Sequence, residues 1–218
     1  MFARKSSLFT MIVVGLVVLS SALAAQDPAP IKLPAPKMDG GMPLMQALKA
    51  RHSEREFGAA KLAPQALSNL LWAAWGINRP DGHRTAPSAS NKQELEIYVT
   101  LPEGAFVWDA KTNTLNPVAA GDLRGATGTQ PFPATAALNL VYVADMSKAG
   151  RPATDPQQAM NVGADAGAIV QNVYLFCASE GLVSVVRASV PKDALAKQLK
   201  LRDTQLIVLA QSVGYPKK

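Results

Sequence analysis

Residues 157–180 carry the longest helical pattern in the sequence, and Gly181 follows as a helix-ending residue. Apolar side chains recur on nearly every side of this segment instead of along a single stripe. A helix of that kind is buried on more than one side, often in an interface between subunits. Gly163 and Gly167 lie within it and would let another backbone approach closely. The rest of the fold therefore has to supply several partners for this one helix.

The remaining segments alternate between helical and strand patterns. Shorter helices are predicted where a Pro precedes apolar residues spaced three or four positions apart, at 43–50, 64–75 and 191–199. Strands are predicted from alternating or continuous apolar runs at 95–100, 138–144, 183–188 and 205–213, with a hairpin formed by 106–108 and 114–118. The sum is an α+β fold, with a mostly antiparallel or mixed sheet and helices packed around it.

The N-terminus has the pattern of a secretory signal peptide at residues 1–25. Arg4 and Lys5 form a basic region, residues 8–19 are apolar, and a small-x-small cleavage pattern follows at 22–24. The apolar stretch is slightly short for a comfortable membrane span, and an uncleaved N-terminal anchor stays open as the alternative. Cleavage predicts a periplasmic or secreted protein that keeps no membrane span after processing.

A second N-terminal segment, residues 26–41, is rich in Pro, Ala and Gly and carries few large apolar residues. Such a segment cannot bury enough surface to fold alone, so we expect an extended linker here. A single domain is then predicted at 42–218, with 48% hydrophobic residues in the whole chain to build its core.

Composition argues against two classes of partner. The formal charge is +6 at pH 7, but the basic residues are spread out and no basic helix with interleaved aromatics occurs, so nucleic acid is not an expected partner. His52 and His83 are too few for a histidine-based metal site. The single cysteine, Cys177, has no partner for an internal disulfide or a zinc site and is expected to be a small buried hydrophobe.

Two polar clusters are candidates for a binding site. Residues 83–93 (HRTAPSASNKQ) fall between a predicted helix and a predicted strand, where loops often carry functional groups. Residues 51–55 (RHSER) follow the first helix. Each cluster also has a plain structural interpretation: the first as a solvated turn, the second as cations that complement the negative end of a helix dipole.

Taken in order, four motifs resemble the nitroreductase superfamily of FMN-dependent oxidoreductases. They are RHSEREF at 51–57, RTAPSASNKQ at 84–93, the helix ADAGAIVQNVYLFCASEGL at 164–182, and VGYP at 213–216. Each motif alone is weak, and their common order carries the resemblance. The hairpin FVWDAKTNTL at 106–115 resembles the SagB/ThcOx-type branch, which includes azoline-oxidising dehydrogenases.

The resemblance implies an α+β homodimer with one FMN in each of two clefts at the subunit interface. Arg51 and Ser53 would contact the FMN phosphate or ribityl chain, and Arg55 would lie near the pyrimidine edge of the flavin. The full set of implied FMN contacts is Arg51, His52, Ser53, Arg55, Pro87, Ser88, Ala89, Asn91, Val186, Arg187, Ala188 and Lys217.

The residues of that set outside 51–55 have different implied roles. Residues 87–91 would line the flavin ring from the facing subunit, and residues 186–189 would border it near N5. Family members commonly place basic residues of a C-terminal extension on the phosphate. In this sequence Lys217 or Arg187 would have to take that role.

The expected function is an exported FMN oxidoreductase that passes a hydride between a donor, such as NAD(P)H or another reductant, and a small conjugated acceptor. No side chain is expected to act as acid or nucleophile, because the hydride chemistry belongs to the cofactor. The alternative is a degenerate family member that acts as a binding or scaffold protein. A hydrolase is disfavoured because Ser88 lies in no nucleophile elbow. No Lys-Tyr pair of the azoline dehydrogenases is found, so peptide azoline oxidation itself is not expected.

Overall fold

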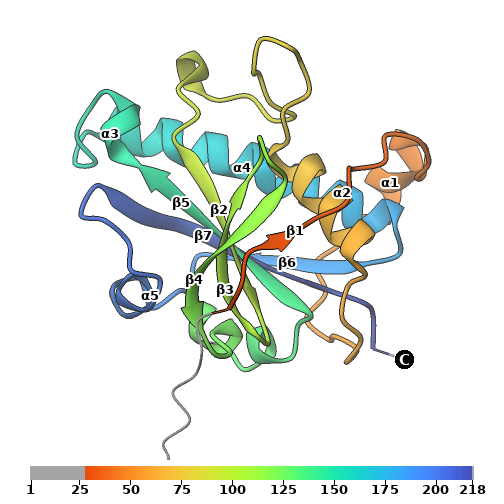
Figure 1. Ribbon diagram of the computed structural model, residues 1–218. Helices are drawn as coiled ribbons and strands as arrows, with labels where there is room; N and C mark the ends of the chain where they lie inside the picture. Colours follow the sequence, from red (N-terminus) through yellow and green to blue (C-terminus); the bar gives the residue numbers. More distant parts are fainter. Residues whose placement is uncertain (1–27, 218) are drawn as a thin grey trace, which may run out of the picture.

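The computed structural model describes residues 28–217 and shows a seven-stranded sheet in that part of the chain (Figure 1). The strand order is β1-β4-β3-β2-β5-β7-β6, and every neighbouring pair is antiparallel. The strands are β1 (Ile31–Lys32), β2 (Leu95–Leu101), β3 (Gly104–Asp109), β4 (Thr114–Ala120), β5 (Leu138–Asp145), β6 (Val183–Arg187) and β7 (Gln205–Gly214). The α+β prediction is thereby confirmed, while the predicted signal peptide at 1–25 lies outside the described residues.

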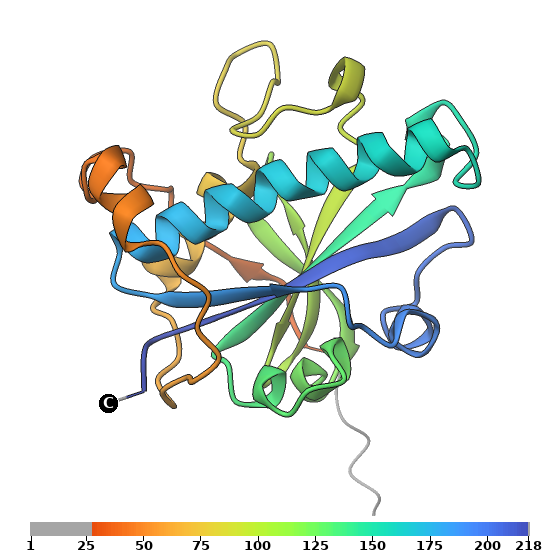
Figure 2. The same ribbon diagram turned by 180° about the vertical axis from the view of Figure 1, so that it is seen from behind.

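Helices cover both faces of this sheet. The α-helices are α1 (Leu44–Ala50), α2 (Pro64–Trp75), α3 (Met146–Ala149), α4 (Pro156–Ser179) and α5 (Lys192–Gln198); short 3₁₀ helices are η1 (Ala89–Asn91), η2 (Arg124–Thr127) and η3 (Phe132–Ala134). Helices α2 and α4 share one hydrophobic core with the sheet, and α5 packs into a second core on the opposite face. Figure 2 shows α4 running across the strands, with α1 against its C-terminal end. No helix within residues 28–217 is long and apolar enough to span a membrane.

The central strand β5 explains why the two cores are separate. All eight of its residues are buried, as expected for a strand covered on both faces. On the α4 face, the Tyr142 hydroxyl donates to Gln211 Oε1 (2.6 Å), and Gln211 Nε2 donates to Ser184 Oγ (2.7 Å). This chain of bonds joins β5, β7 and β6 beneath α4, so polar groups buried there are satisfied.

The long helix α4 starts at a local signal in the sequence. Pro156 occupies its first turn, and the Asp155 carboxylate accepts hydrogen bonds from the backbone N–H groups of Gln157 (2.8 Å) and Gln158 (3.4 Å). One face of the helix packs in the core, whereas Gly163 and Gly167 face open space. The predicted helix is confirmed, and within this single chain one of its sides stays uncovered.

The expected linker at 26–41 is in part a piece of the domain. Strand β1 pairs with β4 (Ile31 opposite Leu115), and the Leu33 side chain is only 3% exposed in the core. The Ser68 hydroxyl of α2 donates to the Pro34 carbonyl (2.6 Å) and holds the next residue in place. The predicted domain boundary at Met42 is therefore too late. A two-residue strand is too short to show a period in the sequence.

Replacing Leu33 by Ala tests this boundary. A leucine buried in the core costs about 2–5 kcal/mol when truncated to Ala, so we expect Leu33→Ala to lower the free energy of unfolding within that range in a urea titration. The neighbouring exposed Lys32→Ala variant serves as control and should change it by less than about 0.5 kcal/mol. Equally small effects of both substitutions on the free energy of unfolding would show that residues 31–33 belong to a linker.

Candidate functional site

Residues 51–55 dock onto the edge strand β6 beside Tyr174 of α4. The backbone N–H of Glu54 donates to the Ser184 carbonyl (3.0 Å). Ser53 Oγ lies 2.8 Å from the Tyr174 hydroxyl oxygen, which also accepts the backbone N–H of Val186 (2.9 Å). One buried phenol thus brings together two of the predicted FMN contacts, Ser53 and Val186. Tyr174 itself was read from the sequence only as part of an apolar helix.

Two cations of this segment are free to take an anion. The Arg51 guanidinium lies over the Tyr174 ring, 5.3 Å from its centroid, in a cation–π contact. Within residues 28–217, no carboxylate lies within ion-pair distance of Arg51 or Arg55. The Glu54 carboxylate accepts the backbone N–H groups of Glu56 (3.0 Å) and Arg55 (2.6 Å), which lower its pKa. Neither arginine is therefore neutralised by its own segment.

Lys217 and His52 lie at the same end of the molecule. The Lys217 ammonium is 3.7 Å from Glu56 Oε2, and both residues line a cavity of about 370 Å³ together with His52. The His52 ring is exposed, with Nδ1 2.9 Å from the Ala50 carbonyl oxygen. A contact of His52 or Lys217 with a phosphate stays a prediction. His52 belongs to the 51–55 segment, and Lys217 lines the same cavity as that segment.

Arg187 lies elsewhere. Because side chains alternate along a strand, Val186 and Arg187 of β6 point to opposite faces of the sheet. The Arg187 side chain is buried and donates to Ser212 Oγ (2.6 Å), Thr127 Oγ1 (2.7 Å) and Asn139 Oδ1 (3.1 Å). Burial lowers the pKa of this guanidinium to about 10. Because of these hydrogen bonds and its burial, Arg187 is no longer a candidate for binding the phosphate. Ala188 beside it is exposed.

The loop at 83–93 is braced from within. Arg84 Nε donates to Gln93 Oε1 (2.8 Å) and Arg84 Nη1 donates to the Trp75 carbonyl (2.7 Å), so the two ends of the loop are tied to α2. The Gln93 backbone N–H donates to Ser88 Oγ (3.0 Å), and Gln93 Nε2 donates to Asn91 Oδ1 (2.9 Å). Ser88 and Asn91 therefore have structural roles, whatever else they bind.

The tip of this loop is strained and attached to α4. Ser90, Asn91 and Gln93 have positive φ angles (53°, 52° and 48°), a conformation that costs energy for residues other than glycine and clusters at functional sites. The backbone N–H of Ala89 donates to Asp165 Oδ2 (2.9 Å), whereas Pro87 is exposed.

The two candidate clusters are not joined within one chain. The loop is held at Asp165 and the 51–55 segment at Tyr174, nine residues apart on α4. Since each helical residue adds about 1.5 Å, the two attachment points are roughly 13 Å apart along the axis. A site that uses both clusters at close range therefore has to combine residues of two copies or bind a long ligand.

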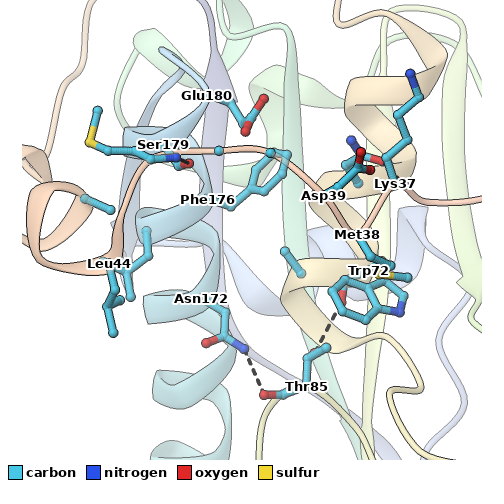
Figure 3. A pocket seen from close by; sticks show the side chains of 17 residues that line it. Lys37, Met38, Asp39, Leu44, Trp72, Thr85, Asn172, Phe176, Ser179 and Glu180 are labelled. Atoms are coloured by element: carbon cyan, nitrogen blue, oxygen red, sulfur yellow. Dashed lines mark hydrogen bonds between the residues drawn. The ribbon is translucent and has the colours of Figure 1, made fainter.

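A cavity of about 590 Å³ was not anticipated from the sequence (Figure 3). It lies between the segment 37–42, α2 and α4, with Trp72 on one side and Phe176 on the other. Asn172 of α4 donates to the Thr85 carbonyl (3.3 Å) at one end of it. Among the described residues, no group of three or more His, Cys, Asp or Glu side chains is placed to hold a metal ion.

This arrangement matches a known family. A sequence profile described as "Nitroreductase family" matches residues 48–215. A candidate nitroreductase of Methanocaldococcus jannaschii is 28% identical over 76% of this chain and 88% of its own. The solved structure of a candidate nitroreductase from Ralstonia eutropha is 36% identical, with a TM-score of 0.82 over 98% of this chain and 97% of that one. The chain belongs to the nitroreductase family, which confirms the predicted nitroreductase-like enzyme at the level of the family.

More distant structures share the fold. The NADPH:FMN oxidoreductase of Vibrio harveyi, solved with NAD+, is 20% identical, with a TM-score of 0.58 over 80% of this chain and 69% of that one. A chain of the microcin synthetase complex McbBCD of E. coli is 18% identical, with a TM-score of 0.66 over 95% of this chain and 85% of that one. At these identities the likeness concerns the fold.

Proposed function

We propose that this protein binds FMN and passes a hydride between a donor and a small conjugated acceptor, such as a nitro compound or a quinone. The observation that carries the proposal is a pair of guanidiniums, Arg51 and Arg55, that have no carboxylate within ion-pair distance among residues 28–217. Arg51 and Ser53 both contact Tyr174 beside the edge strand β6. Planar guanidinium donors suit a phosphate dianion, which they contact in charge-assisted and often bidentate bonds. The residues present therefore fit the phosphate end of the cofactor.

Each segment has a separate task in this proposal. FMN, when bound, supplies the hydride chemistry, and the chain supplies binding and orientation. Arg51 and Ser53 hold the phosphate or ribityl chain, and Arg55 faces the pyrimidine edge. The half-buried edge at Val186 and the exposed Ala188 border the flavin ring, and the braced loop at 87–91 covers it from a second copy of the chain.

The proposal also covers the electron donor and the branch of the family. An NADPH:FMN oxidoreductase among the proteins that share the fold supports a reduced nicotinamide as donor. A fold shared with a microcin synthetase chain, together with the hairpin of β3 and β4, supports the SagB/ThcOx-type branch. The signal pattern at 1–25 supports export to the periplasm or beyond. For an exported protein, the donor would be NAD(P)H or another reductant that is available outside the cytoplasm.

The way the site is divided supports a homodimer. The clusters at 51–55 and 87–91 attach to α4 roughly 13 Å apart, and in the proposal they contact one flavin from two copies of the chain. The uncovered side of α4 at Gly163 and Gly167 would let a second backbone come close. Large apolar side chains are also exposed at Met160 of α4 and, toward the C-terminal end of that helix, at Met38, Leu44, Met45 and Leu48.

An Arg51→Ala variant tests the flavin proposal. A charge-assisted contact is worth about 1.5–3 kcal/mol, so loss of Arg51 should weaken FMN binding by roughly 10- to 150-fold in a fluorescence titration. Wild-type protein should show a bound-flavin absorbance spectrum that dithionite bleaches and air restores. Lys49→Ala removes the same charge two residues upstream, on exposed α1, and should leave binding unchanged.

The same titration also distinguishes the flavin proposal from the alternative of a binding or scaffold protein. A folded wild-type protein that binds no FMN even in excess would contradict the proposal and support a degenerate binding or scaffold protein. Equal FMN affinity of wild type and Arg51→Ala would reject the assigned phosphate site while leaving flavin binding itself in place.

An Ala164→Glu variant tests the dimer. Ala164 is exposed on α4, and a charge there would have to be buried between two copies. We expect wild type to sediment as a dimer, and Ala164→Glu as a monomer with weakened FMN binding. Ala194→Glu, the same change at an exposed position of α5, should stay dimeric. A wild-type protein that sediments as a monomer and still binds FMN would exclude residues 87–91 of a second copy from the site.

The N-terminus of the expressed protein tests export. We expect the intact mass of protein from the periplasmic fraction to correspond to a chain starting near residue 26. Full-length protein that stays in the membrane fraction would point instead to an uncleaved anchor.

A further inference from the structure

The Tyr174 side chain of α4 contacts both residues that are proposed to hold the phosphate or ribityl chain of FMN. Tyr174 is only 6% exposed. The Arg51 guanidinium lies over its ring, 5.3 Å from the centroid, and its hydroxyl oxygen lies 2.8 Å from Ser53 Oγ. Ser53 itself is exposed, so a ligand can reach it. One buried aromatic residue thus supports a guanidinium and a hydroxyl at the surface.

The direction of the hydrogen bond between Tyr174 and Ser53 follows from a third group. The backbone N–H of Val186 donates to the Tyr174 hydroxyl oxygen (2.9 Å). A backbone N–H can only donate, so the phenol is the acceptor in that bond and its own hydrogen needs a different partner. Among residues 28–217, the hydrogen-bond partners of this hydroxyl are the Val186 N–H and Ser53 Oγ. Since buried donors are nearly always paired, the phenol donates to Ser53.

The position of β6 at the edge of the sheet explains why the phenol is needed as an acceptor. Strand β6 pairs with β7 on one side only. On its other side, the Ser184 carbonyl accepts the backbone N–H of Glu54 (3.0 Å), and the Val186 N–H donates to Tyr174. Val186 is half-buried, and a backbone N–H shielded from water costs free energy when it has no acceptor. The fold therefore fixes the phenol as the acceptor of this bond.

This direction leaves the Ser53 hydrogen available for a ligand. A serine hydroxyl carries one hydrogen and two lone pairs, and Tyr174 takes one of the lone pairs. Within the described part of the chain, Ser53 Oγ has no hydrogen-bond partner besides Tyr174. A phosphate group offers acceptor oxygens, so it needs donors on the protein. In the opposite direction, Ser53 would use its hydrogen on Tyr174 and could offer a phosphate nothing but lone pairs.

We propose that Tyr174 is a positioning residue of the FMN site, whose hydroxyl orients Ser53 as a hydrogen-bond donor to the phosphate. Its ring holds the Arg51 guanidinium beside that donor. The inference rests on the proposed FMN function and assigns Ser53 to the phosphate instead of the ribityl chain. Tyr174 acts through Ser53 and Arg51, whose geometry it sets before the ligand arrives.

A Tyr174→Phe variant tests the role of the hydroxyl, because it keeps the ring under Arg51. FMN and riboflavin, which lacks the phosphate, are titrated separately by fluorescence. We expect Tyr174→Phe to weaken FMN binding at least about fivefold, the equivalent of one net hydrogen bond. Riboflavin binding should change by less than about twofold. Tyr98→Phe is the matched control, since the Tyr98 hydroxyl contacts Gln205 (3.2 Å) at the second core, and it should change neither affinity.

A Ser53→Ala variant separates positioning from a structural effect of Tyr174. Ser53 is exposed, and its loss should weaken FMN binding at least about tenfold while riboflavin binding changes by less than about twofold. Adding Tyr174→Phe to Ser53→Ala should weaken FMN binding by less than about twofold more, because the phenol acts through Ser53. Effects that multiply in the double variant would overturn the proposal. So would equal losses of FMN and riboflavin affinity in either single variant.

Hydrogen exchange of the Val186 amide tests the bonds in the flavin-free protein. It should be faster in Tyr174→Phe than in wild type and unchanged in Ser53→Ala, because only the first variant removes the acceptor of this N–H. Unchanged exchange in Tyr174→Phe would overturn the donor direction whether or not flavin binds. Wild type that binds no FMN would reject the proposed function and with it this role of Tyr174. FMN binding that Tyr174→Phe leaves unchanged would reject the role of Tyr174 alone.

Discussion

Helix α4 buries one face against the central strands, and this packing fixes the geometry of both candidate sites. Its buried face carries the anchors: Asp165 holds the loop tip, Asn172 holds the start of the same loop, and Tyr174 holds the 51–55 segment. A helix is rigid over this distance, so these attachment points keep a constant spacing. The positions of the 83–93 loop and the 51–55 segment are therefore fixed by α4 and not by contacts between the two.

The same packing leaves the other side of α4 without a cover in the single chain. A helix that is apolar nearly all round is buried on more than one side, and here only one side meets the sheet, α1 and α2. The exposed apolar residues Leu44, Met45 and Leu48 of α1 lie at its C-terminal end. In the proposed dimer, a second copy would cover this side, and its 87–91 loop would reach the first copy's 51–55 segment. Burial of α4 and completion of the proposed flavin site would then have the same cause.

Local patterns predicted the elements well because their causes are local. Pro64 and Gly76 delimit α2 where expected, and the unbroken apolar run of β5 is buried on both faces. Strand β1 escaped detection because two residues show no period, and its place depends on pairing with β4. The roles of Tyr174 and Glu94 were likewise invisible, since each depends on partners that only the folded chain brings near. Arg187 was misassigned because a one-residue step along β6 changes the face of the sheet.

Two buried ionisable side chains, Arg187 of β6 and Glu94 just before β2, are accommodated in different ways. Arg187 is 6% exposed, yet neutral acceptors from Thr127, Asn139 and Ser212 take its terminal nitrogens. Its Nε lacks a partner but lies against Gly128, where no space is left for a ligand. Glu94 is 1% exposed, and burial together with a hydrogen bond to the Asp165 carboxyl raises its pKa. Burial alone thus does not mark a binding site, because neighbouring groups can satisfy a buried ionisable side chain.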